Sequence, residues 1–203
     1  MVLFNKELTY NESGSGWCID TGRKLDLQEV AKIESYLLSK SADQIRHINE
    51  TLLPHLVGTY ELLKQWGNPV DICLAGLLHT SYGTEGFTHA FFDSDSRDEL
   101  VKLIGKPAEE LVWFYGRCDR AFMYSNIIEG HFNAYLDRYS GAIWQPAQNL
   151  LSAFLELTFA NELEILRRTP FTEEARMLWS KRFLPCKEMV SQPAYDYFLS
   201  VLG

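Results

Sequence analysis

The sequence predicts an all-α fold preceded by a short irregular segment. Apolar residues recur at helical spacing through most of the chain, between capping residues or prolines and closing glycines. No stretch alternates apolar and polar residues over a length that would build a sheet. Residues 1–25 contain the turn-rich strings NESGSGW and DTG. We therefore expect an irregular segment over residues 1–25 and a single helical domain over residues 26–203.

Capping signals place the first three helices. Asp26 is a good N-cap for LQEVAKIESYLLSK. Pro54 fits the first turn of a second helix, HLVGTYELLKQW, which Gly67 closes. Asn68–Pro69 then reads as the N-cap and first position of a third helix, which we expect to run to His79.

The later helices follow from the same signals. Ser96 can cap RDELVKLIG, and Pro107 opens AEELVWFYGRCDRAF. Pro146 opens the longest helix, AQNLLSAFLELTFANELEILRR. Thr172 caps EEARMLWSKRF, and AYDYFLSVL closes the chain.

Composition and charge narrow the function classes. A net charge of −8 argues against nucleic acid as the main partner. The apolar runs are too short to span a bilayer, and MVLFNKELTY lacks the regions of a signal peptide, so we expect a cytoplasmic protein without a membrane partner. The cysteines form no CxxC pair, which predicts reduced thiols. They are Cys18, Cys73, Cys118 and Cys186.

The spacing of two histidines predicts a shared site. His55 lies eleven residues before Trp66, and His79 lies eleven residues after Asn68. If a tight turn at Gly67–Asn68 joins two antiparallel helices, both imidazoles lie at the same end of the pair, level to within about one turn. The matched spacing favours a common site over two separately packed histidines.

These residues resemble the HD-domain superfamily, whose site takes a histidine from one helix, a His-Asp pair from the next and an aspartate from a later helix. RHINETLLPH resembles the Arg-x-Ser-Gly-Glu-Pro-Tyr-x-x-His pattern of RelA/SpoT-type hydrolase domains, which remove pyrophosphate from guanosine alarmones. Arg46, Glu50 and His55 fall in register, and His79 follows His55 at the matching 24-residue step. FANELEIL resembles their Ala-Asp-Arg-Leu-His-Asn helix. The chain also resembles a family of short, uncharacterised HD-like proteins.

The departures from that pattern bear on function. Thr80 stands where the resemblance places the aspartate of the His-Asp pair, and Gly83–Thr84 stands where the alarmone hydrolases carry a catalytic Glu-Asp. Asn161 stands where the resemblance places the last metal-binding aspartate. Because Mn²⁺ and Mg²⁺ prefer anionic oxygen ligands, we expect no alarmone hydrolysis by the usual metal-dependent route.

The first hypothesis is a small-molecule enzyme of lyase, isomerase or hydrolase type that needs no cofactor. His55 and His79 would act as general acid and base in the former metal cavity, with Thr80 and Asn161 as catalytic hydrogen-bonding partners. Ligand contacts are expected from four neighbours: Arg46, His47, Tyr82 and Thr84. A homodimer is left open.

Two alternatives come from other classes. A metal-dependent oxygenase or phosphohydrolase would hold Fe, Zn or Mn with His55 and His79, joined by His47, His89 or His131. A non-catalytic module would use the same cavity to bind a ligand. Metal content separates the second hypothesis from the others, and turnover separates the first from the third.

Two adjacent pairs of charged residues have interpretations that need no functional site. Glu109–Glu110 reads as a solvated helix start that favours the helix dipole. Asp119–Arg120 is either an exposed pair or an ion pair of the pocket.

Overall fold

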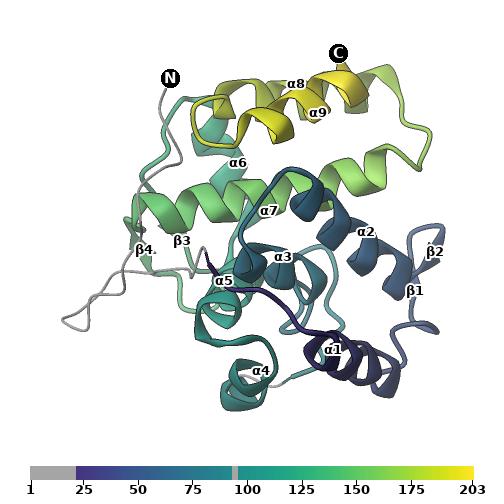
Figure 1. Cartoon of the computed structure of the whole chain (residues 1–203). Helices are drawn as coiled ribbons and strands as arrows, with labels where there is room; N and C mark the ends of the chain where they lie inside the picture. Colours follow the sequence, from purple (N-terminus) through teal and green to yellow (C-terminus); the bar gives the residue numbers. More distant parts are fainter. Residues whose placement is uncertain (1–21, 93–95) are drawn as a thin grey trace.

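The computed structural model describes residues 22–92 and 96–203. Most of the irregular segment expected at residues 1–25, including Cys18, therefore lies outside the described residues. Within the described ranges the chain is helical apart from two small hairpins, which confirms the all-α fold class (Figure 1).

The helices of the described residues, in chain order, are α1 (Leu27–Ser39), α2 (Leu52–Gln65), α3 (Val70–Leu77), α4 (Arg97–Ile104), α5 (Lys106–Arg117), α6 (Arg120–Ile128), α7 (Gln148–Leu166), α8 (Glu173–Phe183) and α9 (Gln192–Leu202). A 3₁₀ turn, η2 (Leu184–Cys186), follows α8. One hairpin pairs β1 (Arg46–His47) with β2 (Glu50–Thr51), and the other pairs β3 (Tyr135–Leu136) with β4 (Ile143–Trp144), both antiparallel.

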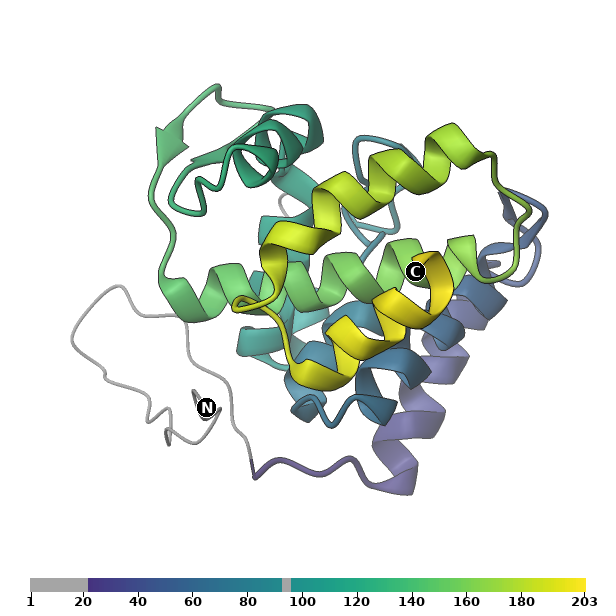
Figure 2. The same cartoon turned by 90° about the horizontal axis from the view of Figure 1, so that it is seen from above.

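Helix α7 is the centre of the fold. Figures 1 and 2 show it crossing the molecule, with α2, α3 and α5 on one side and α8 and α9 on the other. The ring of Phe159 stacks on Phe183 of α8 at 4.1 Å, while Leu157 and Leu163 are fully buried. A helix covered on both sides is apolar nearly all round. The polar side chains of α7 that are buried, such as Asn161 and Glu164, therefore need partners inside the protein.

Side-chain caps account for several helix boundaries. Asp26 accepts from the backbone N–H of Glu29, whose carboxylate accepts from Asp26 in return, so the predicted start of α1 carries a capping box. Thr172 caps α8 through the N–H of Ala175, as expected.

The single helix expected from Pro107 to Phe122 is wrong. Helix α5 ends at Arg117, and Asp119 accepts from the N–H of Phe122 to begin α6. An aspartate favours the cap over the helix interior because its short side chain competes for backbone hydrogen bonds.

The turn between α2 and α3 differs in detail from the prediction. Gly67 adopts a φ of 80°, which glycine tolerates without strain, and Asn68 donates its side-chain N–H to the carbonyl of Leu63. Asn68 thus closes α2 instead of capping α3, whose N-cap is Pro69. Helix α3 ends at Leu77, so His79 lies in the turn beyond the helix.

No helix among the described residues has the length and apolar character needed to cross a membrane. Three cysteines are free and buried, and burial raises the pKa of each thiol to about 12. They are Cys73, Cys118 and Cys186. We infer that these thiols stay protonated and serve in packing.

Candidate functional site

A cavity of about 530 Å³ lies where β1, the turn after α3, the start of α6 and the end of α7 meet. Its wall contains six residues that the sequence analysis selected: Arg46, His47, His79, Thr80, Thr84 and Asn161. Of the other two, His55 lies immediately behind the wall, fully buried, and Tyr82 lies elsewhere.

The two histidines from α2 and the turn after α3 lie side by side. His55 Nε2 and His79 Nε2 are 3.4 Å apart, with the rings at 83° to each other. Both side chains are buried, at 0% and 2% exposure. The equal spacing about the Gly67 turn therefore does bring both imidazoles to one end of the helix pair.

The tautomer of His79 follows from its second ring nitrogen. Nδ1 lies 2.7 Å from the carbonyl oxygen of Gly76, which can only accept, so Nδ1 carries a proton. Burial, together with the nearby His55, holds the pKa of His79 well below its usual value. His79 is therefore a neutral imidazole whose Nε2 lone pair faces His55.

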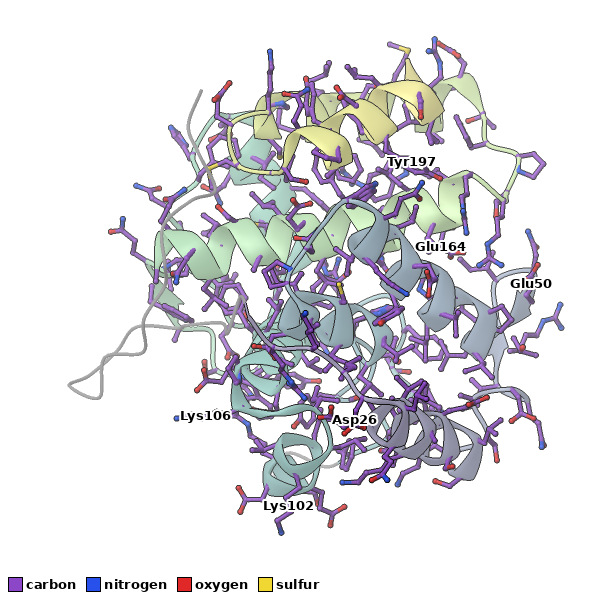
Figure 3. All side chains as sticks on the ribbon, in the orientation of Figure 1. Asp26, Glu50, Lys102, Lys106, Glu164 and Tyr197 are labelled. Carbon is purple, nitrogen blue, oxygen red and sulfur yellow. The ribbon has the colours of Figure 1, made fainter. Side chains whose placement is uncertain are left out.

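His55 is anchored by a carboxylate of α7. Its Nδ1 lies 2.6 Å from Glu164 Oε2, where α7 passes over α2 (Figure 3). Burial alone would raise the pKa of Glu164, but hydrogen bonds from His55 and Arg168 lower it below its usual value. Glu164 is therefore an ionised acceptor, and His55 donates through Nδ1–H.

Asn161 completes the environment of His55. Its Oδ1 lies 3.1 Å from His55 Nε2, while its Nδ2–H₂ donates to Glu162 Oε1 at 3.1 Å, which sets the orientation of the amide. If His55 Nε2 carried no proton, three acceptor atoms would meet with no hydrogen between them: His55 Nε2, His79 Nε2 and Asn161 Oδ1. The network is satisfied when His55 is the imidazolium, with Nε2–H shared between Asn161 and His79.

Asp119 and Arg120 are neighbours in the chain but have different structural roles. Asp119 caps α6, whereas the Arg120 side chain lines the cavity, with its guanidinium carbon 4.1 Å above the ring of Tyr115. Arg120 Nη1 lies 3.8 Å from Glu162 Oε1. Of the two residues, only Arg120 therefore lies in the cavity wall, and its acidic neighbour there is Glu162 instead of Asp119.

Three polar atoms of the cavity wall reach no acceptor among the described residues. They are Thr80 Oγ1, Tyr115 Oη and Arg120 Nε. Thr80 and Tyr115 are 2% and 0% exposed, so both hydroxyls belong to the protein interior, where polar groups normally have partners.

Tyr82, expected among the ligand-binding residues, does not line the cavity. Its hydroxyl donates to Glu109 Oε1 at 2.7 Å, and Arg97 binds the same carboxylate through two N–H groups. Glu109 is 1% exposed, so its interpretation as a solvated residue is wrong. This buried cluster ties α4 and α5 to the turn after α3.

Two of the extra histidines do not reach the site. His89 is exposed between the rings of Phe87 and Phe91, and His131 is exposed beside Glu129. Neither lines the cavity, so both are wrong as candidate ligands.

His47 does lie at the site, stacked on His55 with ring centroids 4.3 Å apart and planes at 20°. The in-plane lone pairs of two nearly parallel, stacked rings do not converge on one point. Burial, followed by the proximity of His55, lowers the pKa of His47 to about 4.

The donor set does not fit the hard divalent metal that the resemblance implies. The two imidazole Nε2 atoms meet the amide oxygen of Asn161, and no carboxylate oxygen contacts either Nε2 atom among the described residues. In the described part of the chain, no group of three or more His, Cys, Asp or Glu residues could hold a metal ion. Glu50, which falls in register with the alarmone-hydrolase pattern, pairs with Arg168 at the outer edge of the hairpin (Figure 3).

The sequence analysis missed Glu162 and Glu164. Both lie within one turn of Asn161 on α7, so the i+3 spacing of Glu164 was a usable signal once Asn161 had been chosen.

One family model, described as "Domain of unknown function (DUF6817)", matches residues 36–120. That range contains His55, His79 and Thr80 but ends before α7 and its residues Asn161 and Glu164. No curated protein and no solved structure matches the chain.

Proposed function

We propose that the chain is a small-molecule enzyme in which His79 acts as general base and His55 as general acid. The observation that carries this proposal is the 3.4 Å separation of the two Nε2 atoms, with each Nδ1 tied to a different acceptor. A cavity of about 530 Å³ falls within the usual range for small-molecule sites.

His79 would accept the proton. Its Nδ1–H is held by the Gly76 carbonyl, so only Nε2 can act as a base, and that residue is part of the cavity wall. Because its pKa is held below the usual value, His79 is available in the neutral form throughout the physiological pH range.

His55 would donate the proton. Glu164 accepts from Nδ1 and stabilises the imidazolium, which leaves Nε2–H as the transferable proton. Because His55 lies behind the cavity wall, its proton would reach the substrate by way of His79 Nε2, to which it is hydrogen-bonded. A substrate that loses one proton to this imidazole pair and gains one from it undergoes isomerisation or elimination. We therefore favour a lyase or isomerase over a hydrolase, working in the cytoplasm without a bound metal.

A second candidate is supported by one feature of the same geometry. Metal-binding histidines commonly donate their other ring N–H to a carboxylate or a backbone carbonyl, as His55 and His79 do here. A soft or borderline ion such as Fe²⁺ or Zn²⁺ would be the type that two imidazoles accept. A ligand-binding module without turnover is the third outcome.

The decisive experiment needs no knowledge of the substrate. The protein, purified without chelators or a metal-affinity tag, is incubated in D₂O with mixtures of small metabolites while C–H signals are followed by NMR. The proposal predicts loss of signal from one compound, abolished in His79→Gln, with metal content far below stoichiometric. Stoichiometric Fe or Zn that is lost in His79→Gln would overturn the proposal in favour of the second candidate.

A further inference from the structure

Unpaired hydrogen-bond donors gather on one side of the cavity. Thr80 Oγ1, Tyr115 Oη and Arg120 Nε come from the turn after α3, from α5 and from the start of α6. Buried polar groups of folded proteins almost always have partners, so three donors without an acceptor on residues of one cavity wall indicate a place for a ligand acceptor.

The acidic groups of the cavity wall are already engaged. Glu85 accepts from the backbone N–H of Arg120 at 2.6 Å. Glu162 accepts from Asn161 and Tyr124 and faces the Arg120 guanidinium. The formal charges of the two arginines and two glutamates in the wall cancel, and each glutamate is bound through one carboxylate oxygen.

We infer that Arg120, Tyr115 and Thr80 form a subsite for an oxyanion, a carboxylate or phosphoryl group of the substrate. Arg120 Nε can only donate, and the two hydroxyl protons can rotate toward the same acceptor. A guanidinium and two hydroxyls give charge-assisted hydrogen bonds, which are stronger than neutral ones.

The position of the subsite connects it to the histidine pair. Thr80 directly follows His79, and the ring of Tyr115 meets the His79 ring edge-on at 5.5 Å. An oxyanion held there places the adjoining atoms of the same molecule beside His79. The inference thus rests on the proposed function for its link to turnover, whereas oxyanion binding can be measured alone.

The test is isothermal titration calorimetry of the full chain with two probes, inorganic phosphate and acetate, at constant ionic strength. We expect saturable binding of at least one probe, and the preferred probe distinguishes a phosphoryl from a carboxylate subsite. Thr80→Val and Tyr115→Phe should each weaken that binding about tenfold or more, the usual consequence of losing a hydrogen bond to a charged group.

Stability measurements separate a binding role from a structural one. Thr80 Oγ1 has no partner in the free protein, so Thr80→Val should leave the melting temperature equal or slightly higher. Tyr115 Oη reaches no acceptor but accepts from Arg120, so Tyr115→Phe should lower the melting temperature only slightly. Ser81→Ala is the matched control, since Ser81 Oγ is also buried and unpartnered but does not line the cavity. It should leave probe affinity unchanged.

Absence of phosphate and acetate binding to the wild-type protein would overturn the inference. Unchanged affinity in both Thr80→Val and Tyr115→Phe would do the same. If the probes bind as expected and no proton exchange is found, the subsite stands and the proposed acid–base function fails.

Discussion

Glu164 on α7 binds His55 on α2 at 2.6 Å, although 109 residues separate them in the chain. Arg168, just beyond the C-terminal end of α7, also binds Glu164, through Nη2 at 2.8 Å. Both members of the histidine–carboxylate pair are 1% exposed in their side chains. The acid of the proposed pair is thus set by a contact between two helices, and the first predictions concern that contact.

Glu164→Gln should destabilise the protein strongly, because the amide replaces a charged acceptor, leaves His55 without its counterion and leaves Arg168 with Glu50 alone. Removing one partner of a buried ion pair costs about 3–5 kcal/mol. The isosteric amide still offers an acceptor oxygen, so the loss of stability here should be somewhat smaller. Equilibrium urea unfolding measures the loss. Glu61→Gln is the control, since the exposed Glu61–Lys64 pair should change stability by less than about 0.5 kcal/mol. Equal losses in the two variants would contradict the prediction.

Gly58→Ala should also destabilise, against the general preference of helices for alanine. A Cβ at Gly58 would lie 2.5 Å from Glu164 Oε1, so the carboxylate must move away from its bond to His55. The helix-propensity gain of about 1 kcal/mol should be outweighed. The comparison is thermal unfolding against Gly86→Ala, where an added Cβ meets nothing within 4 Å. A variant more stable than wild type would show that Glu164 relaxes freely.

Stability should fall as the pH drops below the usual histidine value. The pKa of His79 is lower in the folded protein than the 6.5 of a free histidine, so the unfolded chain binds more protons as the pH falls below that value. Unfolding is favoured by up to about 1.4 kcal/mol per pH unit for this one group. Urea unfolding at pH 7.5, 6.0 and 5.0 should show the fall, and His79→Gln should reduce its slope. A flat profile for the wild type would contradict the burial of a neutral imidazole.

Two helix starts were readable from the sequence because a side chain makes the cap, Asp26 for α1 and Thr172 for α8. Asp119 caps α6 in the same way, but it lies within a stretch that the sequence predicted as one continuous helix. The proximity of His55 and His79 also followed, because equal distances from one turn depend only on helical rise. Such arguments use local geometry and one connection.

The remaining site residues depend on contacts that no local pattern encodes. Glu164 acts on His55 because α7 packs on α2, and Glu109 is buried because Arg97 and Tyr82 reach it from other elements. Arg120 enters the cavity because Asp119 ends one helix and begins another, which turns the chain at that point. Tertiary packing decides these cases.

The chain should show no appreciable alarmone pyrophosphohydrolase activity with added Mn²⁺. In the resemblance to the alarmone hydrolases, Thr80, Gly83, Thr84 and Asn161 stand where those enzymes carry acidic groups. In the described part of the chain, no carboxylate contacts the two Nε2 atoms. Product analysis by chromatography, with an intact alarmone hydrolase as the positive control, measures this. Turnover at the control's level would show that other residues hold the metal.

Thr80→Asp tests whether the cavity can bind a metal ion. Restoring the carboxylate of the His-Asp pair adds a buried negative charge beside His79, where the wild-type hydroxyl is 2% exposed and has no acceptor. If the cavity works without metal, the new charge has no metal ion to pair with, while Arg120 already faces Glu162 and His55 is already paired with Glu164. Stability should then fall by about 1–3 kcal/mol, the usual range for a poorly compensated buried polar group.

The neutral control for that substitution is Thr80→Asn, which adds similar volume without charge. Unfolding of Thr80→Asp, Thr80→Asn and wild type is compared with and without Mn²⁺ or Fe²⁺. A metal that binds only the native state stabilises it by RT ln(1 + [L]/Kd), where [L] is the free metal concentration. A metal site in the aspartate variant would therefore appear as metal-dependent stabilisation of that variant alone. We expect no such stabilisation. If it appears, and the variant is as stable as Thr80→Asn, the two imidazoles are still arranged as metal ligands and the metal-free assignment of His55 and His79 fails.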